Sequence, residues 1–119
     1  MITANLPIFK ASLDLTVYVD KIVKNFEKYH KYTFGEDLRV YSKNILFLIN
    51  RANISKDKQR VEYITKLRDR CEDLKMLILL GKELKAFKSF NQFQYISKLT
   101  VDVAKQSQNW LNYCARILK

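Results

Sequence analysis

Turn-forming residues are scarce in this chain of 119 residues, which contains two glycines and one proline. A sheet of many hairpins needs such residues at its turns, so the composition argues against an all-β fold. Histidine occurs once and cysteine twice, which leaves no ligand set for a structural zinc site. No apolar run approaches the ~18 residues of a membrane span, and Met1–Lys10 lacks the features of a signal peptide. We therefore expect a cytoplasmic helical protein with no membrane span and no metal or other cofactor.

Positive charge is in clear excess. The chain carries 22 Lys and Arg against 12 Asp and Glu, a formal net charge of +10. A field of this size on a small protein attracts polyanions, so RNA, DNA and anionic lipid are the natural partners, although basicity alone does not choose among them. The length fits one domain with one core, which we place at residues 1–119.

Apolar residues recur at three- and four-residue steps in the first half of the chain, as amphipathic helices require. A first helix opens near Pro7, and its predicted inward residues are Ile8, Ala11, Leu15, Val19, Ile22 and Phe26. The pattern then breaks at Glu27–Thr33, where Thr33 and Glu36 form a predicted capping box. The second helix follows, with predicted inward residues Leu38, Tyr41, Ile45, Leu48 and Ala52.

The second half of the chain also contains two predicted amphipathic helices. A short turn at 53–55, with Ser55 as a candidate cap, precedes a helix that we expect to end near Phe87. Its predicted inward residues are Ile64, Leu67, Cys71, Leu74, Ile78 and Gly81. Ser89 and Gln92 form a second predicted capping box, and the last helix carries Phe93, Ile96, Thr100, Val103, Ser107, Trp110, Cys114 and Ile117. Short connections make neighbouring helices antiparallel, so we expect an all-α, up-down four-helix bundle.

Two helices carry more apolar surface than a monomeric bundle can bury. The runs 45–49 and 76–80 are apolar throughout, and at about 100° per residue each run covers the whole helix circumference. Exposed apolar patches mark protein interfaces. We therefore expect a homo-oligomer, with interface residues Phe47, Leu77, Leu79 and Leu80, unless long neighbouring side chains cover them.

The sequence offers little for catalysis. His30 is the only histidine, and no serine or cysteine has a neighbouring base. The two glycines are isolated and cannot form a phosphate-binding loop. We expect Cys71 and Cys114 to be reduced core residues, with a disulfide as the alternative. Trp110 lies on the inward face, which favours core packing over stacking on a base. An enzyme is therefore disfavoured.

Basic residues are aligned on three of the predicted helices. Arg68, Lys75 and Lys82 repeat every seven residues and so lie in one line along their helix. Lys21, Lys24 and Lys28 trace a stripe on the first helix, together with Lys10 and Lys31. Lys98, Lys105, Arg116 and Lys119 share a polar face on the last. Such rows suit contacts with a phosphate backbone, although a solvated bundle surface can look the same.

Several segments resemble the accessory variability determinant (Avd) family of diversity-generating retroelements, whose relatives are encoded in ribosomal-RNA intervening sequences. The similar segments are Tyr18 and its neighbours, Phe26-Glu27-Lys28, Lys31-Tyr32-Thr33-Phe34-Gly35-Glu36, Arg51-Ala52-Asn53, Leu74-Lys75-Met76-Leu77, and Val103-Ala104-Lys105 before Trp110. The chain departs from the family pattern at Glu27, Ala104 and Gln108-Asn109.

The resemblance implies a pentameric ring of four-helix bundles that binds the RNA of the element and its reverse transcriptase, and so supports mutagenic copying of a template repeat. The pentamer number comes from the resemblance alone. A protein of the ribosomal-RNA intervening-sequence type, or a structural module whose positive surface meets an acidic protein, are the alternatives.

Overall fold

Four long helices dominate the computed structural model, which describes residues 1–118. A 3-10 turn, η1, spans Thr3–Asn5, and the helices are α1 (Pro7–Val23), α2 (Lys28–Lys31), α3 (Phe34–Ile54), α4 (Asp57–Glu83) and α5 (Phe90–Ile117). No strand occurs among these residues. The predicted all-α class is confirmed, and the stretch 27–33 that was expected to be irregular contains the single turn of α2.

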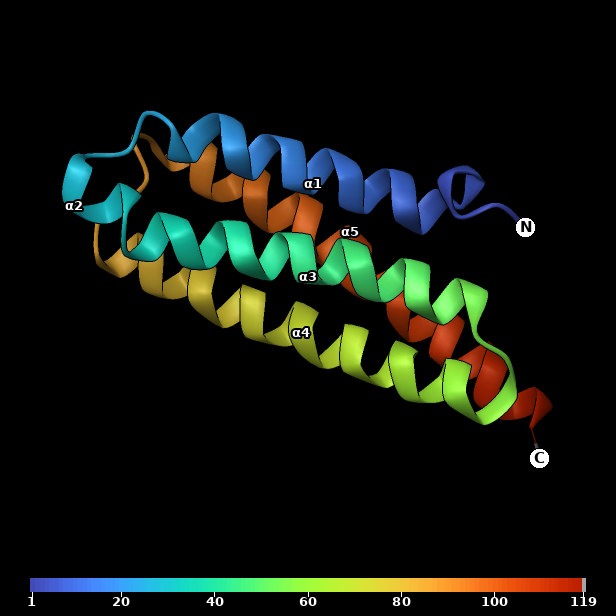
Figure 1. Ribbon diagram of the computed structural model, residues 1–119. Helices are drawn as coiled ribbons and strands as arrows, with labels where there is room; N and C mark the ends of the chain where they lie inside the picture. The colour runs from blue at the N-terminus through green and yellow to red at the C-terminus, as the bar shows by residue number, and fades with distance from the viewer. Residues whose placement is uncertain (119) are drawn as a thin grey trace.

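The long helices form an antiparallel up-down bundle (Figure 1). Helix α1 packs against α3 and α5, and α4 packs against the same two helices. Helices α1 and α4 therefore occupy diagonally opposite corners, which separates the side chains on their outer faces. Both chain ends lie at one end of the bundle, and α2 lies at the other (Figure 1). No helix in residues 1–118 is long and apolar enough to cross a membrane.

The core follows the predicted apolar spacing closely, except at the end of α5, where Ile117 was expected to face inward and is 61% exposed. Its fully buried members come from all four long helices: Leu15, Val19, Leu38, Ile45, Ile49, Ile64, Leu67, Leu74, Ile96 and Val103. Each such side chain contributes roughly 1.5–3 kcal/mol by leaving water. Trp110 is half-buried and packs against the core, as expected. Cys71 and Cys114 are buried free thiols, so the expectation of reduced core cysteines is confirmed.

Both glycines are buried where another element comes close. A methyl group on Gly35 would meet Val23 Cγ1 at 2.7 Å and the His30 carbonyl oxygen at 3.0 Å. A methyl group on Gly81 would overlap the ring of Phe34. These contacts let the start of α3 sit close to the end of α4, in a cluster of aromatic rings where Phe34 stacks on Phe26 at 6.2 Å.

Of the two predicted capping boxes, the structure contains one. Ser89 accepts a hydrogen bond from the Gln92 amide at 3.2 Å, so this predicted cap is confirmed. Gln92 Oε1 in turn accepts from the Lys88 amide at 2.9 Å. The predicted cap at Thr33 is wrong, because its hydroxyl donates to the Tyr29 carbonyl at 2.7 Å.

The turn between α3 and α4 forms where predicted, with different end residues. Helix α3 ends at Ile54 with Ser55 as its C-cap, so the prediction that Ser55 caps the next helix is wrong; Lys56 holds the N-cap position of α4 without a side-chain hydrogen bond. Arg60 closes the turn instead. Its guanidinium donates to the Asn53 carbonyl at 2.8 Å and to the Ala52 carbonyl at 3.0 Å, which also accepts from the Ser55 amide at 3.3 Å.

Helix α4 ends at Glu83, four residues before the predicted end near Phe87. Lys85 adopts a left-handed conformation with φ of 58°. Its amide bonds to the Lys82 carbonyl at 3.1 Å, and the Ala86 amide bonds to the Gly81 carbonyl at 3.0 Å. This pair of bonds is a Schellman motif, which usually places glycine where this chain has lysine. The sequence did not predict that α4 ends at Glu83, because the residues at positions 83–86 all favour a helix.

Candidate nucleic-acid interface

The row Arg68, Lys75 and Lys82 lies on the side of α4 that faces α5. Lys82 shows that this side of α4 faces α5, because its ammonium lies 5.0 Å from the ring centroid of Phe93 and 5.9 Å from that of Phe90, both on α5. Arg68 and Lys75 follow at seven-residue steps and share this side of α4.

The three cations of this row differ in their partners. Lys75 Nζ lies 3.1 Å from Glu72 Oε1, and Arg68 Nη2 lies 3.1 Å from Asp69 Oδ1. Both carboxylates are exposed, so these pairs are weak and can exchange for a phosphate. Lys82 has no ion pair within residues 1–118. We therefore regard it as the cation of the row that is most available to a ligand.

Helix α5 adds two more lysines beside this row. Lys98 and Lys105 line a surface hollow together with the rings of Phe90 and Phe93. Asp102 also lines this hollow and lowers its positive charge. Neither lysine forms an ion pair among the described residues.

Lys85 completes the surface at the turn between α4 and α5. It lines a second hollow with Lys82, Phe87 and the same two rings, Phe90 and Phe93. The two hollows therefore adjoin through these rings. We call the combined surface the α4–α5 basic face; it consists of Arg68, Lys75, Lys82, Lys85, Lys98 and Lys105.

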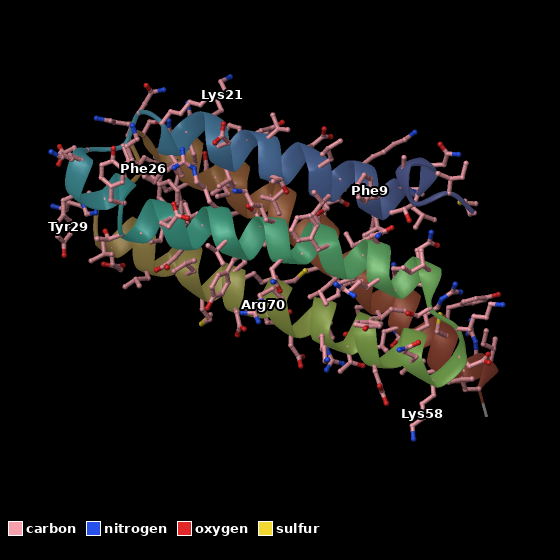
Figure 2. All side chains as sticks on the ribbon, viewed as in Figure 1. Phe9, Lys21, Phe26, Tyr29, Lys58 and Arg70 are labelled. Atoms are coloured by element: carbon pink, nitrogen blue, oxygen red, sulfur yellow. The ribbon has the colours of Figure 1, made fainter. Side chains whose placement is uncertain are left out.

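The remaining predicted cations lie elsewhere. Lys21 lies on α1, at the corner diagonal to α4, and Lys24 is the C-cap of this helix and pairs with Asp20 at 3.3 Å. Figure 2 shows Lys21 pointing away from α1, whereas Lys58 of α4 points away on the opposite side of the bundle. Lys28 begins α2 at the end of the bundle.

Arg116, at the far end of α5, stacks over the ring of Tyr113 at 5.9 Å. It lies 18 residues beyond Lys98, or roughly 27 Å along the helix. Lys119 lies outside the described residues. One chain therefore does not gather all the predicted cations into a single surface.

The predicted interface residues divide between two sides of the bundle. Phe47 is 60% exposed on α3 and Leu80 is 50% exposed on α4, where it lines a hollow with Leu84 and the rings of α2. Leu79 is also exposed but lies between Lys75 and Lys82, within the basic face. Leu77 is half-buried and packs against the core.

The titratable core residues are poor candidates for chemistry. Burial raises the pKa of Cys71 to about 12, and burial likewise raises the pKa of Cys114. Both thiols therefore stay protonated at neutral pH, whereas a thiolate is the nucleophilic form. Nδ1 of His30 is buried without a hydrogen-bond partner. Within residues 1–118 no group of three or more His, Cys, Asp or Glu side chains could hold a metal ion.

Comparison of the chain with protein-family models, with curated proteins and with solved structures finds no match. The resemblance to the accessory variability determinant family thus stays a prediction from the sequence.

The sequence analysis missed two residues of this surface: Lys85, and Phe90, which lines both hollows. Lys85 was placed inside a helix, because nothing in its neighbourhood signals the left-handed turn. Phe90 was treated as part of a capping box, although it is 58% exposed. The spacing of Lys82 and Phe90 could not show their contact, which depends on where α4 ends.

Proposed function

We propose that this chain is a non-enzymatic nucleic-acid-binding protein that holds RNA on the α4–α5 basic face. The observation that carries the proposal is the convergence of Lys82, Lys85, Lys98 and Lys105 on two adjoining hollows without an ion pair among the described residues. Unpaired cations in a row are suited to successive phosphates of a backbone.

The resemblance to the accessory variability determinant family supplies a setting for this binding. In that setting the RNA is the template RNA of a diversity-generating retroelement, and a reverse transcriptase is the protein partner during mutagenic cDNA synthesis. The alternatives from the sequence, a protein of the ribosomal-RNA intervening-sequence type or a structural interaction module, predict different partners for the same face.

Salt dependence of RNA binding tests the proposal. Replacing Lys75 and Lys82 together by glutamine should weaken binding and reduce the slope of log affinity against log salt by about 1.4, since each lost phosphate contact contributes about 0.7. Lys82→Gln alone should weaken binding more than Lys75→Gln, because Lys75 already pairs with Glu72. The effect should be similar for RNAs of different sequence.

The matched control removes the same number of positive charges from α1 and its C-cap, at the corner of the bundle diagonal to α4. Lys21→Gln with Lys24→Gln should leave the slope nearly unchanged, although both double variants lower the net charge equally. Circular dichroism and light scattering establish that fold and assembly survive. Equal effects of the two double variants, or no RNA binding by the parent at low salt, would refute the proposed face.

We further propose that copies of the chain associate through the outer surface of α3 and α4, as a ring of five if the family resemblance holds. Val40 and Phe47 are seven residues apart on one side of α3, and Met76 and Leu80 lie four apart on α4. All four are at least 50% exposed, an apolar surface typical of an interface.

A pair of neighbouring leucines tests this assembly. Leu80→Glu should lower the mass measured by light scattering, whereas Leu79→Glu should leave the mass unchanged and weaken RNA binding, because Leu79 lies among the lysines. A parent protein that is monomeric at micromolar concentration would exclude the association.

A further inference from the structure

The first two turns of α5 present aromatic, amide and cationic side chains together on their outer face. Phe90, Gln94 and Lys98 follow one another at four-residue steps, and Asn91 and Tyr95 form the adjacent row. The residues Phe90 and Tyr95 are 58% and 47% exposed, so part of each ring is accessible to a ligand.

Surface hollows flank these rows on both sides. One lies toward α1 and is lined by Tyr18, Asn91, Gln92, Gln94, Tyr95 and Lys98. The other lies toward α4 and includes Phe90, Phe93, Gln94 and Lys98 among its lining residues. Gln94 and Lys98 line both, so an extended ligand could pass from one hollow to the other across α5.

Each exposed ring rests against an inner ring. Phe90 lies 5.7 Å from Phe93 between ring centroids, and Tyr95 meets Tyr18 edge to face at 4.7 Å. The inner rings restrict the motion of the outer ones and leave their other faces open. Lys82 lies over the inner and outer phenylalanines, and its positive charge is placed where a phosphate would follow a stacked base.

The amides between the rings are free to recognise a ligand. The side chains of Asn91 and Gln94 form no hydrogen bond within residues 1–118, in contrast to Gln92, which completes the cap at Lys88. An amide side chain offers a donor and an acceptor side by side, which matches the edge of a nucleobase. Unpaired bases expose both this edge and a face for stacking, whereas bases inside an RNA duplex have their faces stacked and their Watson–Crick edges paired.

We propose that this segment of α5 is a platform for unpaired bases, on which Phe90 and Tyr95 each stack one base of a single-stranded RNA. The inference rests on the proposed function and narrows its ligand from RNA in general to single strands. Phosphates on either side of the stacked bases then contact Lys82 and Lys98. The lysines supply affinity, and the rings supply the preference for single strands over duplexes.

The experiment compares a single-stranded RNA of twelve nucleotides with a duplex of the same length for the parent, Phe90→Leu, Tyr95→Leu and the double variant. Leucine keeps an apolar side chain and removes the stacking surface. Each substitution should weaken single-strand binding about tenfold, as expected for loss of one base–aromatic stack. Duplex binding and the salt slope should stay unchanged, because the phosphate contacts remain.

The matched control is Tyr113→Leu, which removes a ring of similar exposure, 55%, on the same helix, where Arg116 also stacks over it. It lies roughly 27 Å from Tyr95 along α5 and should not alter binding. A 2-aminopurine base within the strand gives a second readout: its fluorescence should fall on binding to the parent and recover in the double variant.

The outcomes separate the two proposals. A parent that binds duplex as tightly as single strand, with both unaffected by Phe90→Leu and Tyr95→Leu, would overturn the platform and leave the basic face intact. Equal losses with Tyr113→Leu would overturn it as well. A parent that binds neither RNA at low salt would refute the proposed function and the platform with it. Circular dichroism on each variant excludes unfolding as the cause of a loss.

Discussion

Replacement of Gly81 by alanine sets two known effects against each other. Gly81 lies inside α4 with ordinary helical backbone, so alanine should stabilise the helix by about 1 kcal/mol. The added methyl group, however, would lie 2.5 Å from Cε2 and 2.9 Å from Cε1 of Phe34, closer than real carbon atoms approach. The sign of the net effect depends on whether the ring can move away.

The surroundings of Phe34 leave its ring little room. Phe34 is 4% exposed, stacks on Phe26 at 6.2 Å and meets Phe87 edge to face at 5.7 Å. Overpacking of this kind costs typically 1–3 kcal/mol, and the crowding here lies at the upper end. Subtracting the gain in helix propensity leaves a net loss of about 2 kcal/mol. For a domain of this size that corresponds to a Tm lower by roughly 8 °C.

Urea unfolding followed by circular dichroism measures this loss, and a double-mutant cycle with Phe34→Leu assigns it. Leucine is smaller than the ring, so Gly81→Ala should cost clearly less in the Phe34→Leu background than in the parent. Coupling of this kind is expected only between residues in contact. A Gly81→Ala variant more stable than the parent, or additive effects of the two changes, would refute the reasoning.

Three other predictions follow from the helix ends and the core. Lys85→Gly should raise the free energy of unfolding by about 0.5–1 kcal/mol in urea titration, because the left-handed φ of 58° suits glycine. Arg60→Ala should lower it by roughly 1.5 kcal/mol in the same assay, because two carbonyls at the end of α3 lose charged donors. Cys71, whose pKa burial raises to about 12, should resist a disulfide reagent at pH 8 until urea unfolds the chain.

The fold could be predicted from the sequence because burial follows helical spacing. Leu15, Leu67 and Ile96 are fully buried at the positions that the apolar period indicates. Helix ends were harder, because they depend on a few hydrogen bonds that compete closely. Thr33 and Ser89 are similar in sequence context, yet Thr33 bonds to the preceding turn and only Ser89 caps its helix.

Those features of the candidate site that lie on a single helix could be predicted from the sequence. Those that depend on how two helices pack could not. The seven-residue repeat of Arg68, Lys75 and Lys82 can be read from the sequence, since it needs only the geometry of α4. The separation of this row from Lys21 needs the packing order of the bundle. The contact between Lys82 and Phe90 could be predicted only if the position of the turn between α4 and α5 were known. The sequence does not indicate this turn, because it has lysine and not glycine at the left-handed position 85.

The two proposed surfaces are compatible because α4 divides its exposed residues between them. Leu80 lines a hollow with Phe34 and Glu36 of α3, where association would bury it, whereas Lys82 lies over Phe90 on the side of α4 that faces α5. An assembly through α3 and α4 would therefore repeat the basic face in every copy. A strand bound by one copy would meet the next at a high effective concentration, so modest affinity per copy would become strong binding overall. As proposed, assembly and RNA binding would thus reinforce each other without sharing a contact, because Leu79 lies in the lysine row and not on the surface proposed for association.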